Sequence, residues 1–207
     1  MSAADESLPL REQNVDPDPL RQFAAWFEQA TATGMPQPEA AAVATASPDG
    51  APSVRMVLVK GFDEHGFVFF TNYESRKGRE LEANPQAALL FHWPPLGRQV
   101  RIEGPVQRVT PEESEAYARS RPRASQLSAL ASPQSSVIES RDTLERRVAE
   151  LDAEHDGAEL PMPSAWGGYR LSPEIYEFWQ HRADRLHDRL RYLPATGGGW
   201  EIERLAP

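Results

Sequence analysis

The residues of this chain most able to do chemistry are cations, which gather in short stretches of an otherwise acidic protein. The 207-residue chain has a formal net charge of -9, yet residues 181–192 hold four arginines and two histidines against two aspartates. Nucleic-acid binding needs a broad basic face, which an acidic chain does not offer. Local positive charge instead indicates a small anionic ligand.

A second group of cations lies where a helix is expected to start. Ser75 is a natural N-cap and Asn84-Pro85 is a stop signal, so Arg76 and Lys77 fall in the first turn. The helix dipole is positive at that end and disfavours a cation by roughly a few tenths of a kcal/mol. A bound phosphate would make the two cations favourable at this position, because they and the backbone N–H groups of the helix start would together bind the anion. The alternative is a pair of solvated surface charges.

Two further clusters carry donors suited to phosphate. Tyr117 and Arg121 are four residues apart, hence on one face at a helix end, and Ser125 follows beyond a proline. Arg55 and Lys60 interrupt an apolar strand, which would point them to opposite faces if it is regular. Each cluster alone also fits a structural role, such as neutralising a helix C-terminus. Together they indicate more than one phosphate, because a highly charged ligand needs several converging donors.

Other chemistries find less support. The chain has no cysteine, which removes disulfides, thiolate nucleophiles and cysteine metal sites and fits a reducing cytoplasm. His181 and His187 are six residues apart and no paired carboxylates occur at ligand spacing, so no metal is expected. No Gly-x-Ser-x-Gly element marks a hydrolase nucleophile, and no apolar run is long enough to cross a membrane.

The elements that must position these residues are mostly strands. Short runs of β-favouring residues between turns predict strands at 40–46, 51–62, 67–72, 86–93, 98–109, 174–180, 186–194 and 200–207. Helical spacing and capping residues predict helices at 20–32, 75–83, 110–122 and 136–153. This order favours a mainly β (α+β) fold, an antiparallel barrel with peripheral helices. We expect one domain over 17–207 after a flexible lead-in over 1–16.

Several stretches, taken in chain order, resemble the FMN-binding core of pyridoxine/pyridoxamine 5'-phosphate oxidases. They are RMVLVKGFDEHGFVFFTNYESRKGRELEANPQAALLFHW, RQVRIEGPVQRV, SRPRASQ, SPQSS, PSAWGGYRLSP, EFWQ, RLHDR and RLAP. The likeness runs from about Asp18 to Pro207. It implies an antiparallel FMN-binding split β-barrel that forms a homodimer, with two FMN sites built across the subunit interface.

The resemblance also implies roles for individual residues. Those expected to contact the flavin are Arg55, Met56, Val57, Leu58, Val59, Lys60, Phe70, Thr71, Gln99, Gln134, Ser135, Trp179 and Arg189, with Arg76 and Lys77 on its phosphate. The substrate's own phosphate would be bound by Lys60, Tyr117, Arg121 and Ser125. The rest of the substrate would meet Arg185, Leu186 and His187, of which Arg185 and His187 are the expected catalytic residues.

The implied reaction is oxidation of the 4' carbon of pyridoxine 5'-phosphate or pyridoxamine 5'-phosphate, in vitamin B6 metabolism. FMN takes up the electrons and O2 reoxidises it with release of H2O2, while the amine substrate also yields NH3. The product in both cases is pyridoxal 5'-phosphate. Arg185 would assist proton removal or polarise the reacting group, and His187 would orient the substrate.

Two departures from the family pattern bear on the expected site. The lead-in contains Arg11 but no tyrosine, so the Arg-x-x-Tyr lid of many members is expected to be short or absent, and His181 replaces a frequent glycine. Two rival functions stay open: a split-barrel flavin or deazaflavin reductase or haem-binding protein, and a non-catalytic module that binds flavin or pyridoxal phosphate. Packing rather than ligand contact is the expected role of Trp26, Trp93, Trp166 and Trp200.

Overall fold

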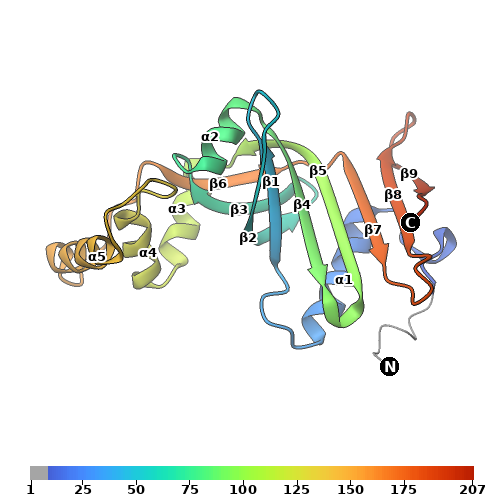
Figure 1. Cartoon of the computed structure of the whole chain (residues 1–207), viewed down its shortest axis with the longest axis horizontal. Coiled ribbons are helices and arrows are strands. Elements are labelled where there is room, and N and C mark those ends of the chain that lie inside the picture. Colours follow the sequence, from blue (N-terminus) through green and yellow to red (C-terminus); the bar gives the residue numbers. More distant parts are fainter. Residues whose placement is uncertain (1–8) are drawn as a thin grey trace.

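The structure is a computed structural model that describes residues 9–207 (Figure 1). The α-helices of this part of the chain are α1 (Pro19–Ala32), α2 (Arg76–Ala83), α3 (Pro111–Ser120), α4 (Arg123–Ala131) and α5 (Arg141–His155). Its strands are β1 (Ala40–Ala46), β2 (Pro52–Asp63), β3 (Gly66–Asn72), β4 (Gln86–Trp93), β5 (Arg98–Arg108), β6 (Trp166–Leu171), β7 (Ile175–Gln180), β8 (Asp188–Pro194) and β9 (Trp200–Arg204). No helix among the described residues is both long and apolar enough to cross a membrane.

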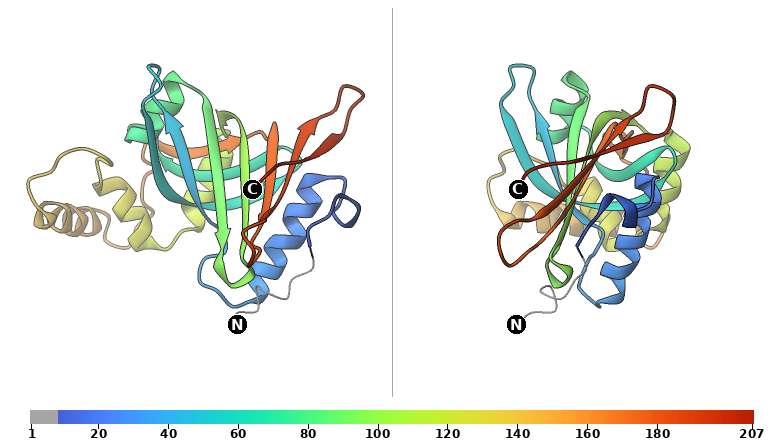
Figure 2. Two further views of the ribbon diagram at one scale, coloured as in Figure 1. Left: turned by 45° about the vertical axis from the view of Figure 1, so that its right-hand side comes forward. Right: turned by 90° about the vertical axis from the view of Figure 1, so that its right-hand side faces the viewer.

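Six of the strands close into an antiparallel barrel, as predicted. Their order is β4-β1-β2-β3-β6-β5, and residues 98–105 of β5 pair back to the whole of β4. Closure depends on the length of β5, whose residues 98–103 also pair with β7 while residues 106–108 pair with β6. From β7 the sheet continues through β8 to β9, which extend away from the barrel (Figure 2).

Aromatic side chains fill the barrel, and α1 packs against them. Asp18 caps this helix by accepting from the Leu20 N–H, with Pro19 at the first helical position. Phe23 of α1 is fully buried, and its ring lies 4.9 Å from the rings of Phe62 and Phe67. Because large aromatic side chains bury much apolar area and prefer edge-to-face contacts, this helix is held firmly against the barrel.

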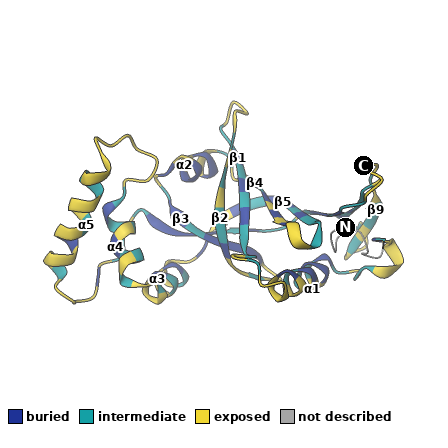
Figure 3. Cartoon of the chain, turned by 60° about the horizontal axis from the view of Figure 1, so that its bottom comes forward, coloured by how far each residue is buried: buried dark blue, intermediate teal, exposed yellow. Residues whose placement is uncertain are grey.

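The helices α4 and α5 form a small unit beside the barrel. Leu127 of α4 packs with Leu151 of α5 and Leu160 in an apolar cluster separate from the barrel core. The rest of the α5 surface is largely exposed (Figure 3). The connection between the two helices carries Gln134 and Ser135, so this unit positions two residues predicted to contact the flavin.

Most of the predicted elements are confirmed, with differences in the stretch between β5 and β7. The structure adds α4 and β6, which the patterns did not indicate. The predicted start of a helix at residue 136 is wrong, because α5 begins only at Arg141. Ser140 caps it by accepting from the Thr143 N–H at 3.3 Å, and Val137 lies fully exposed in the loop before it.

The lead-in expected over 1–16 lies partly outside the described residues, which begin at residue 9. From there to Asp16 the chain runs against β8 and β9. The Leu10 N–H donates to Asp188 at 3.1 Å, and Arg204 donates to the Leu10 carbonyl at 2.7 Å. These bonds attach the segment to the strands that follow the predicted substrate residues.

Candidate active site

The N-terminus of α2 gathers cations that the sequence predicts to hold a phosphate. Ser75 caps the helix, and its Oγ accepts from the Gly78 N–H at 3.3 Å. Arg76 and Lys77 therefore occupy the first turn, as predicted, while no acidic residue does. Because the helix dipole is positive here, this end of α2 is suited to an anion.

Lys77 is a buried cation surrounded by neutral groups. Within the described residues its Nζ bonds to Thr71 Oγ1 and Gln134 Oε1, both at 2.8 Å, and more loosely to Ser75 Oγ at 3.5 Å. Burial, and then the positive charge of Arg55, lower the pKa of Lys77 to about 8. A cation held in this way gains stability from a nearby anion.

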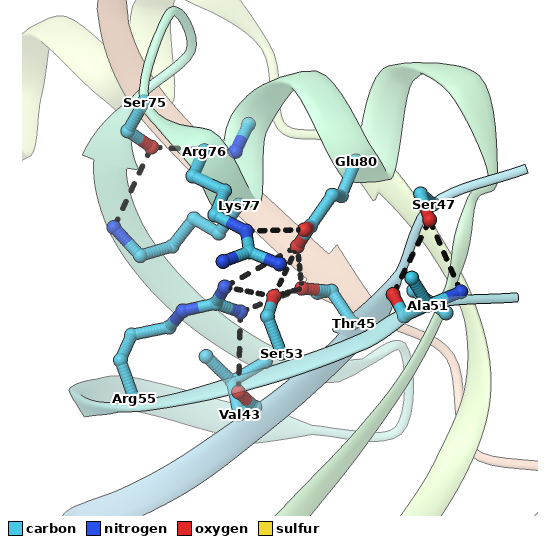
Figure 4. A network of polar contacts seen from close by, with 12 residues as sticks. Val43, Thr45, Ser47, Ala51, Ser53, Arg55, Ser75, Arg76, Lys77 and Glu80 are labelled. Atoms are coloured by element: carbon cyan, nitrogen blue, oxygen red, sulfur yellow. Dashed lines mark hydrogen bonds and ion pairs between the residues drawn. The ribbon is translucent and has the colours of Figure 1, made fainter. Parts of the chain in front are cut away.

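Arg55 and Arg76 converge on one buried carboxylate, that of Glu80 (Figure 4). Arg76 Nε donates to Oε1 at 2.8 Å, and Arg55 Nη2 donates to Oε2 at 3.2 Å. The hydroxyls of Thr45 and Ser53 donate to the same Oε2. Burial alone would raise the pKa of Glu80, but these four hydrogen bonds outweigh burial and lower the pKa to about 2. The carboxylate is thus ionised at neutral pH and holds both arginines.

Next to this cluster lies a cavity of about 230 Å³ that brings together predicted residues from distant parts of the chain. Its walls are Leu58, Lys60, Phe70, Thr71, Tyr117, Arg121, Gln134 and Trp166. Thr71 and Gln134 are also the partners of Lys77, so the phosphate cluster and the cavity adjoin. Trp166 is the one wall residue that was not predicted to contact a ligand.

An aromatic stack forms one wall of the cavity and supports Arg121. The rings of Phe70 and Tyr117 lie 3.9 Å apart, and Trp166 lies 6.1 Å from Tyr117 and almost parallel to it. The guanidinium of Arg121 lies 4.8 Å from the Trp166 ring centroid. Trp166 is buried, as expected of a packing residue, but it also fixes a cation at the cavity.

Arg121 differs from its neighbours in its charge partners. Arg119 pairs with Glu115, and Arg123 pairs with Asp152. No ion pair between described residues includes Arg121, and burial lowers its pKa, with Tyr117 opposing that effect in part. Arg121 is therefore a second partly buried cation that an anionic ligand would neutralise.

A β-bulge sets the direction of Lys60. The register of β2 against β3 shifts between Val59 and Gly61, so Lys60 is the inserted residue. It lines the cavity, with its Nζ 3.5 Å from Glu39. Arg55 instead contacts the Glu80 cluster, so the two cations of this strand face different sites.

A second group of predicted flavin contacts lies across β5, β7 and β8. Gln99 is directly opposite Trp179, which is directly opposite Arg189, so the three side chains share one face of the sheet. Arg189 Nε donates to the buried carboxylate of Glu177 at 2.8 Å. The Trp179 ring lies 4.7 Å from the His187 ring, which joins a predicted substrate residue to this group.

The connection between β7 and β8 gives its predicted catalytic residues a defined geometry. The Arg182 N–H donates to Nδ1 of His187 at 3.0 Å, so the neutral imidazole carries its proton on Nε2. Arg185 has a φ of 65° and Ser135, at the cavity side, a φ of 71°. Residues other than glycine seldom adopt this left-handed conformation, which Gln37 also adopts outside the predicted site.

One chain does not bring the two groups together. Among the described residues, none from 179–189 lines the cavity, and the β7–β8 strands lie to the right of the barrel in Figure 1 while α3 lies to the left. Leu186 is 67% exposed and Met56, on β2, is 62% exposed. Ser125, within α4, also lies outside the cavity walls.

Two predicted flavin contacts of β2 direct their side chains toward the barrel core. Val59 is buried in the barrel core, and Val57 packs against that core. A ligand on the outer face of β2 would therefore meet the backbone of these residues rather than their side chains.

The sequence of the chain matches two known family descriptions in succession. Residues 27–155 match the family model of pyridoxamine 5'-phosphate oxidase. Residues 166–207 match that of the pyridoxine 5'-phosphate oxidase C-terminal dimerisation region. The chain belongs to the pyridoxamine 5'-phosphate oxidase family.

Individual members of this family are similar over nearly the whole chain. The pyridoxine/pyridoxamine 5'-phosphate oxidase of Rubrobacter xylanophilus is 58% identical over 198 residues, which cover 96% of this chain and 91% of the relative. That of Trichormus variabilis is 55% identical over 198 residues, covering 96% and 92%. Among solved structures, PhzG from Burkholderia lata 383 in complex with tetrahydrophenazine-1-carboxylic acid has a TM-score of 0.92 at 33% identity, covering 99% and 100%. The predicted fold and family are confirmed.

The oxidase family's dimerisation region coincides with β6 to β9, the strands that carry Trp179 and Arg189.

Two residues of the site escaped the sequence patterns. Glu80 stands four residues after Arg76, a spacing that indicates an ion pair on α2. Trp166 precedes two glycines. A Cβ on Gly168 would lie only 2.9 Å from the Phe70 ring, so the glycines allow close packing beside the cavity and are the signal in the sequence that could have indicated it.

Proposed function

We propose that this chain is an FMN-dependent pyridoxine/pyridoxamine 5'-phosphate oxidase that acts as a homodimer with sites shared between subunits. The observation that carries the proposal is the presence of two adjoining cation groups, enough for two phosphates. One group, Arg55, Arg76 and Lys77, would hold the phosphate of FMN. The other, Lys60 and Arg121 with the Tyr117 hydroxyl, would hold the phosphate of the substrate.

The donor set fits FMN. Lys77 is a buried cation whose partners are neutral, and the first turn of α2 offers backbone N–H groups beside it. When bound, FMN supplies the redox chemistry by accepting two electrons from the substrate and delivering them to O2. The alcohol then gives pyridoxal 5'-phosphate and H2O2, and the amine, with one water, gives these products and NH3.

The chain's own residues would bind and orient the substrate. Lys60 and Arg121 would bind the substrate's phosphate, which is remote from the reacting carbon. The free energy of this contact would help to hold the 4' carbon in the orientation that the reaction needs. The Nε2–H of His187 can donate to a substrate oxygen, because the Arg182 N–H occupies Nδ1. Arg185 would stand near the reacting carbon and either assist removal of the proton or polarise the alcohol or amine.

The separation of the two residue groups supports a site shared between subunits. The cavity with Arg121 and the connection with Arg185 lie on different sides of the barrel, and the matched dimerisation region includes the second of them. The proposal is therefore that a partner subunit supplies Arg185, His187 and Trp179 to the cavity of the first. The acidic chain and the absence of cysteine support a cytoplasmic location without nucleic-acid or membrane partners.

The first experiment is an anaerobic spectrum of the FMN-loaded protein with pyridoxamine 5'-phosphate or pyridoxine 5'-phosphate. Bleaching of the flavin band, and its recovery in air with H2O2 and pyridoxal 5'-phosphate, is the expected result. A flavin that binds but is not reduced by either substrate would refute the oxidase and favour a binding module. PhzG was solved with a carboxylic acid that carries no phosphate. If that acid reduces the flavin and neither pyridoxine nor pyridoxamine 5'-phosphate does, the result would indicate an activity like that of PhzG.

A mixing experiment tests the shared site. Arg121→Leu and Arg185→Leu homodimers should each lose at least about nine-tenths of their kcat/KM at each site. In a mixed dimer, one site would carry both substitutions and the other would carry neither, so unfolding and refolding the two variants together should restore activity. No recovery in a confirmed mixed dimer would show that both arginines come from the same chain.

A further inference from the structure

Glu80 lies at the centre of the cations assigned to the FMN phosphate, yet it is itself an anion. It is 7% exposed, and its two oxygens have separate partners. Oε1 accepts from Arg76 Nε, and Oε2 accepts from Arg55 Nη2. One carboxylate thus connects a helix cation to a strand cation 21 positions earlier in the chain.

The hydroxyls of β1 and β2 complete a closed network around this carboxylate (Figure 4). Thr45 Oγ1 donates to Glu80 Oε2 at 2.5 Å and accepts from Arg55 Nη1 at 2.6 Å. Ser53 Oγ likewise donates to Oε2 and accepts from Arg55 Nη2. The two hydroxyls therefore join the Glu80 carboxylate to the Arg55 guanidinium, in addition to the direct bond between them.

Helix stability does not account for this arrangement. The pair Arg76–Glu80 has the cation four residues before the anion, which is the less favourable order for an α-helix. Arg76 also stands where the helix dipole disfavours a cation. The pair therefore contributes little to the stability of α2.

The geometry leaves the terminal nitrogens of Arg76 available to a ligand, whereas those of Arg55 bond to the network. Glu80 occupies the Nε of Arg76, while Nη1 and Nη2 have no partner among the described residues, and the side chain is 59% exposed. The charges of Arg55, Arg76 and Lys77 total +3, and Glu80 reduces this to +2. A phosphate monoester carries about -1.5 to -2 at pH 7, so the net charges match.

We propose that Glu80 is a positioning residue for the FMN phosphate, acting through Arg55 and Arg76. This inference rests on the proposed FMN function. Glu80 holds the two guanidinium groups close to each other and to Lys77 although like charges repel. It does not compete with the phosphate, because it engages the arginines from the side of β1 and β2.

The test compares Glu80→Gln with Glu82→Gln, a matched control. Glu82 is on the same helix, but its side chain is 66% exposed and pairs with Arg108. Kd values for FMN and for riboflavin, which lacks the phosphate, are measured by quenching of flavin fluorescence. Glu80→Gln should weaken FMN binding roughly 10- to 100-fold, the range found for residues that orient ligating groups. Riboflavin binding and the Glu82→Gln variant should change little.

Two further readouts separate positioning from a structural role. Without the Glu80 charge, Arg55 and Arg76 would disfavour the protonated form of Lys77 more strongly, so FMN affinity in Glu80→Gln should begin to fall at a lower pH than in the wild type. If Glu80→Gln does not fold, Ser53→Ala removes one hydroxyl of the network and should show a smaller loss of the same kind.

Three outcomes would overturn the inference. Tighter FMN binding by Glu80→Gln would show that the carboxylate competes with the phosphate. Equal losses for FMN and riboflavin, or an unchanged FMN Kd, would leave Glu80 with a role in folding alone. Failure of the wild-type protein to prefer FMN over riboflavin is a separate result, because it would refute the proposed cofactor before any variant is compared.

Discussion

Replacement of Arg121 by leucine tests the proposed substrate-phosphate site directly. The guanidinium lies at the cavity, 4.8 Å from the Trp166 ring centroid, and no ion pair between described residues includes it. A hydrogen bond to a charged group contributes about 1.5–3 kcal/mol, and each 1.36 kcal/mol is a factor of ten in rate. We therefore expect kcat/KM for pyridoxamine 5'-phosphate to fall about 10- to 150-fold.

The assay compares pyridoxamine 5'-phosphate with pyridoxamine, which lacks the phosphate. We expect kcat/KM for pyridoxamine to be low in the wild type and to change only a few-fold in the variant, through loss of the cation–π contact with Trp166. Arg119→Leu is the matched control, because Arg119 is in the last turn of α3, just before Arg121, but pairs with Glu115. An exposed pair of this kind contributes at most about 1 kcal/mol to stability, and we expect neither substrate to be affected.

The fold should tolerate Arg121→Leu. Burial lowers the pKa of Arg121, which means that folding acts against its charged form. Leucine removes this desolvation, so the Tm of the ligand-free variant should equal or exceed that of the wild type. Equal losses of kcat/KM for both substrates, or a clearly lower Tm with loss of FMN, would refute the assignment because they would indicate damage to the fold.

Three further predictions concern the flavin side. Gly168→Ala places a Cβ 2.9 Å from the Phe70 ring and should lower the free energy of unfolding by about 1–3 kcal/mol and weaken FMN binding. Gly61→Ala, whose Cβ meets nothing within 4 Å, should change neither value by calorimetry or titration. The Kd for FMN should rise above about pH 8, by up to about tenfold per pH unit, as Lys77 loses its proton, whereas the Kd for riboflavin should not. Arg185→Leu should reduce turnover far more than FMN content, and retained turnover would exclude its catalytic role.

Local patterns predicted the barrel because its strands are joined by short turns. In β1 the side chains alternate strictly between buried and partly exposed positions, although the sequence AAAVATA itself carries no alternation of apolar and polar residues. The α4–α5 region was harder to predict, since Leu127 and Leu151 pack on each other rather than on the barrel. A small helical unit with its own core leaves a weak apolar pattern, and Pro122 gave no sign that a helix follows it.

The candidate site was predictable in its parts but not in its assembly. Capping by Ser75 fixed Arg76 and Lys77 at a helix start, and this depends only on neighbouring residues. The convergence of Arg55 on Glu80 depends on folding, because β2 must pass beneath α2. Local spacing therefore revealed the cations and missed the carboxylate that orders them.

Lys77 gives folding and cofactor binding opposite dependences on pH. Its pKa is about 8 in the folded chain instead of 10.5, so between these values the unfolded chain binds more protons and the stability of the ligand-free protein rises with pH. FMN affinity falls over the same interval, because the phosphate needs the protonated amine. Since stabilisation by a ligand grows with its concentration relative to Kd, the stabilisation by FMN should be larger at pH 7 than at pH 9. Positive charge in this cluster thus destabilises the barrel by itself and becomes a source of stability once an anion neutralises it.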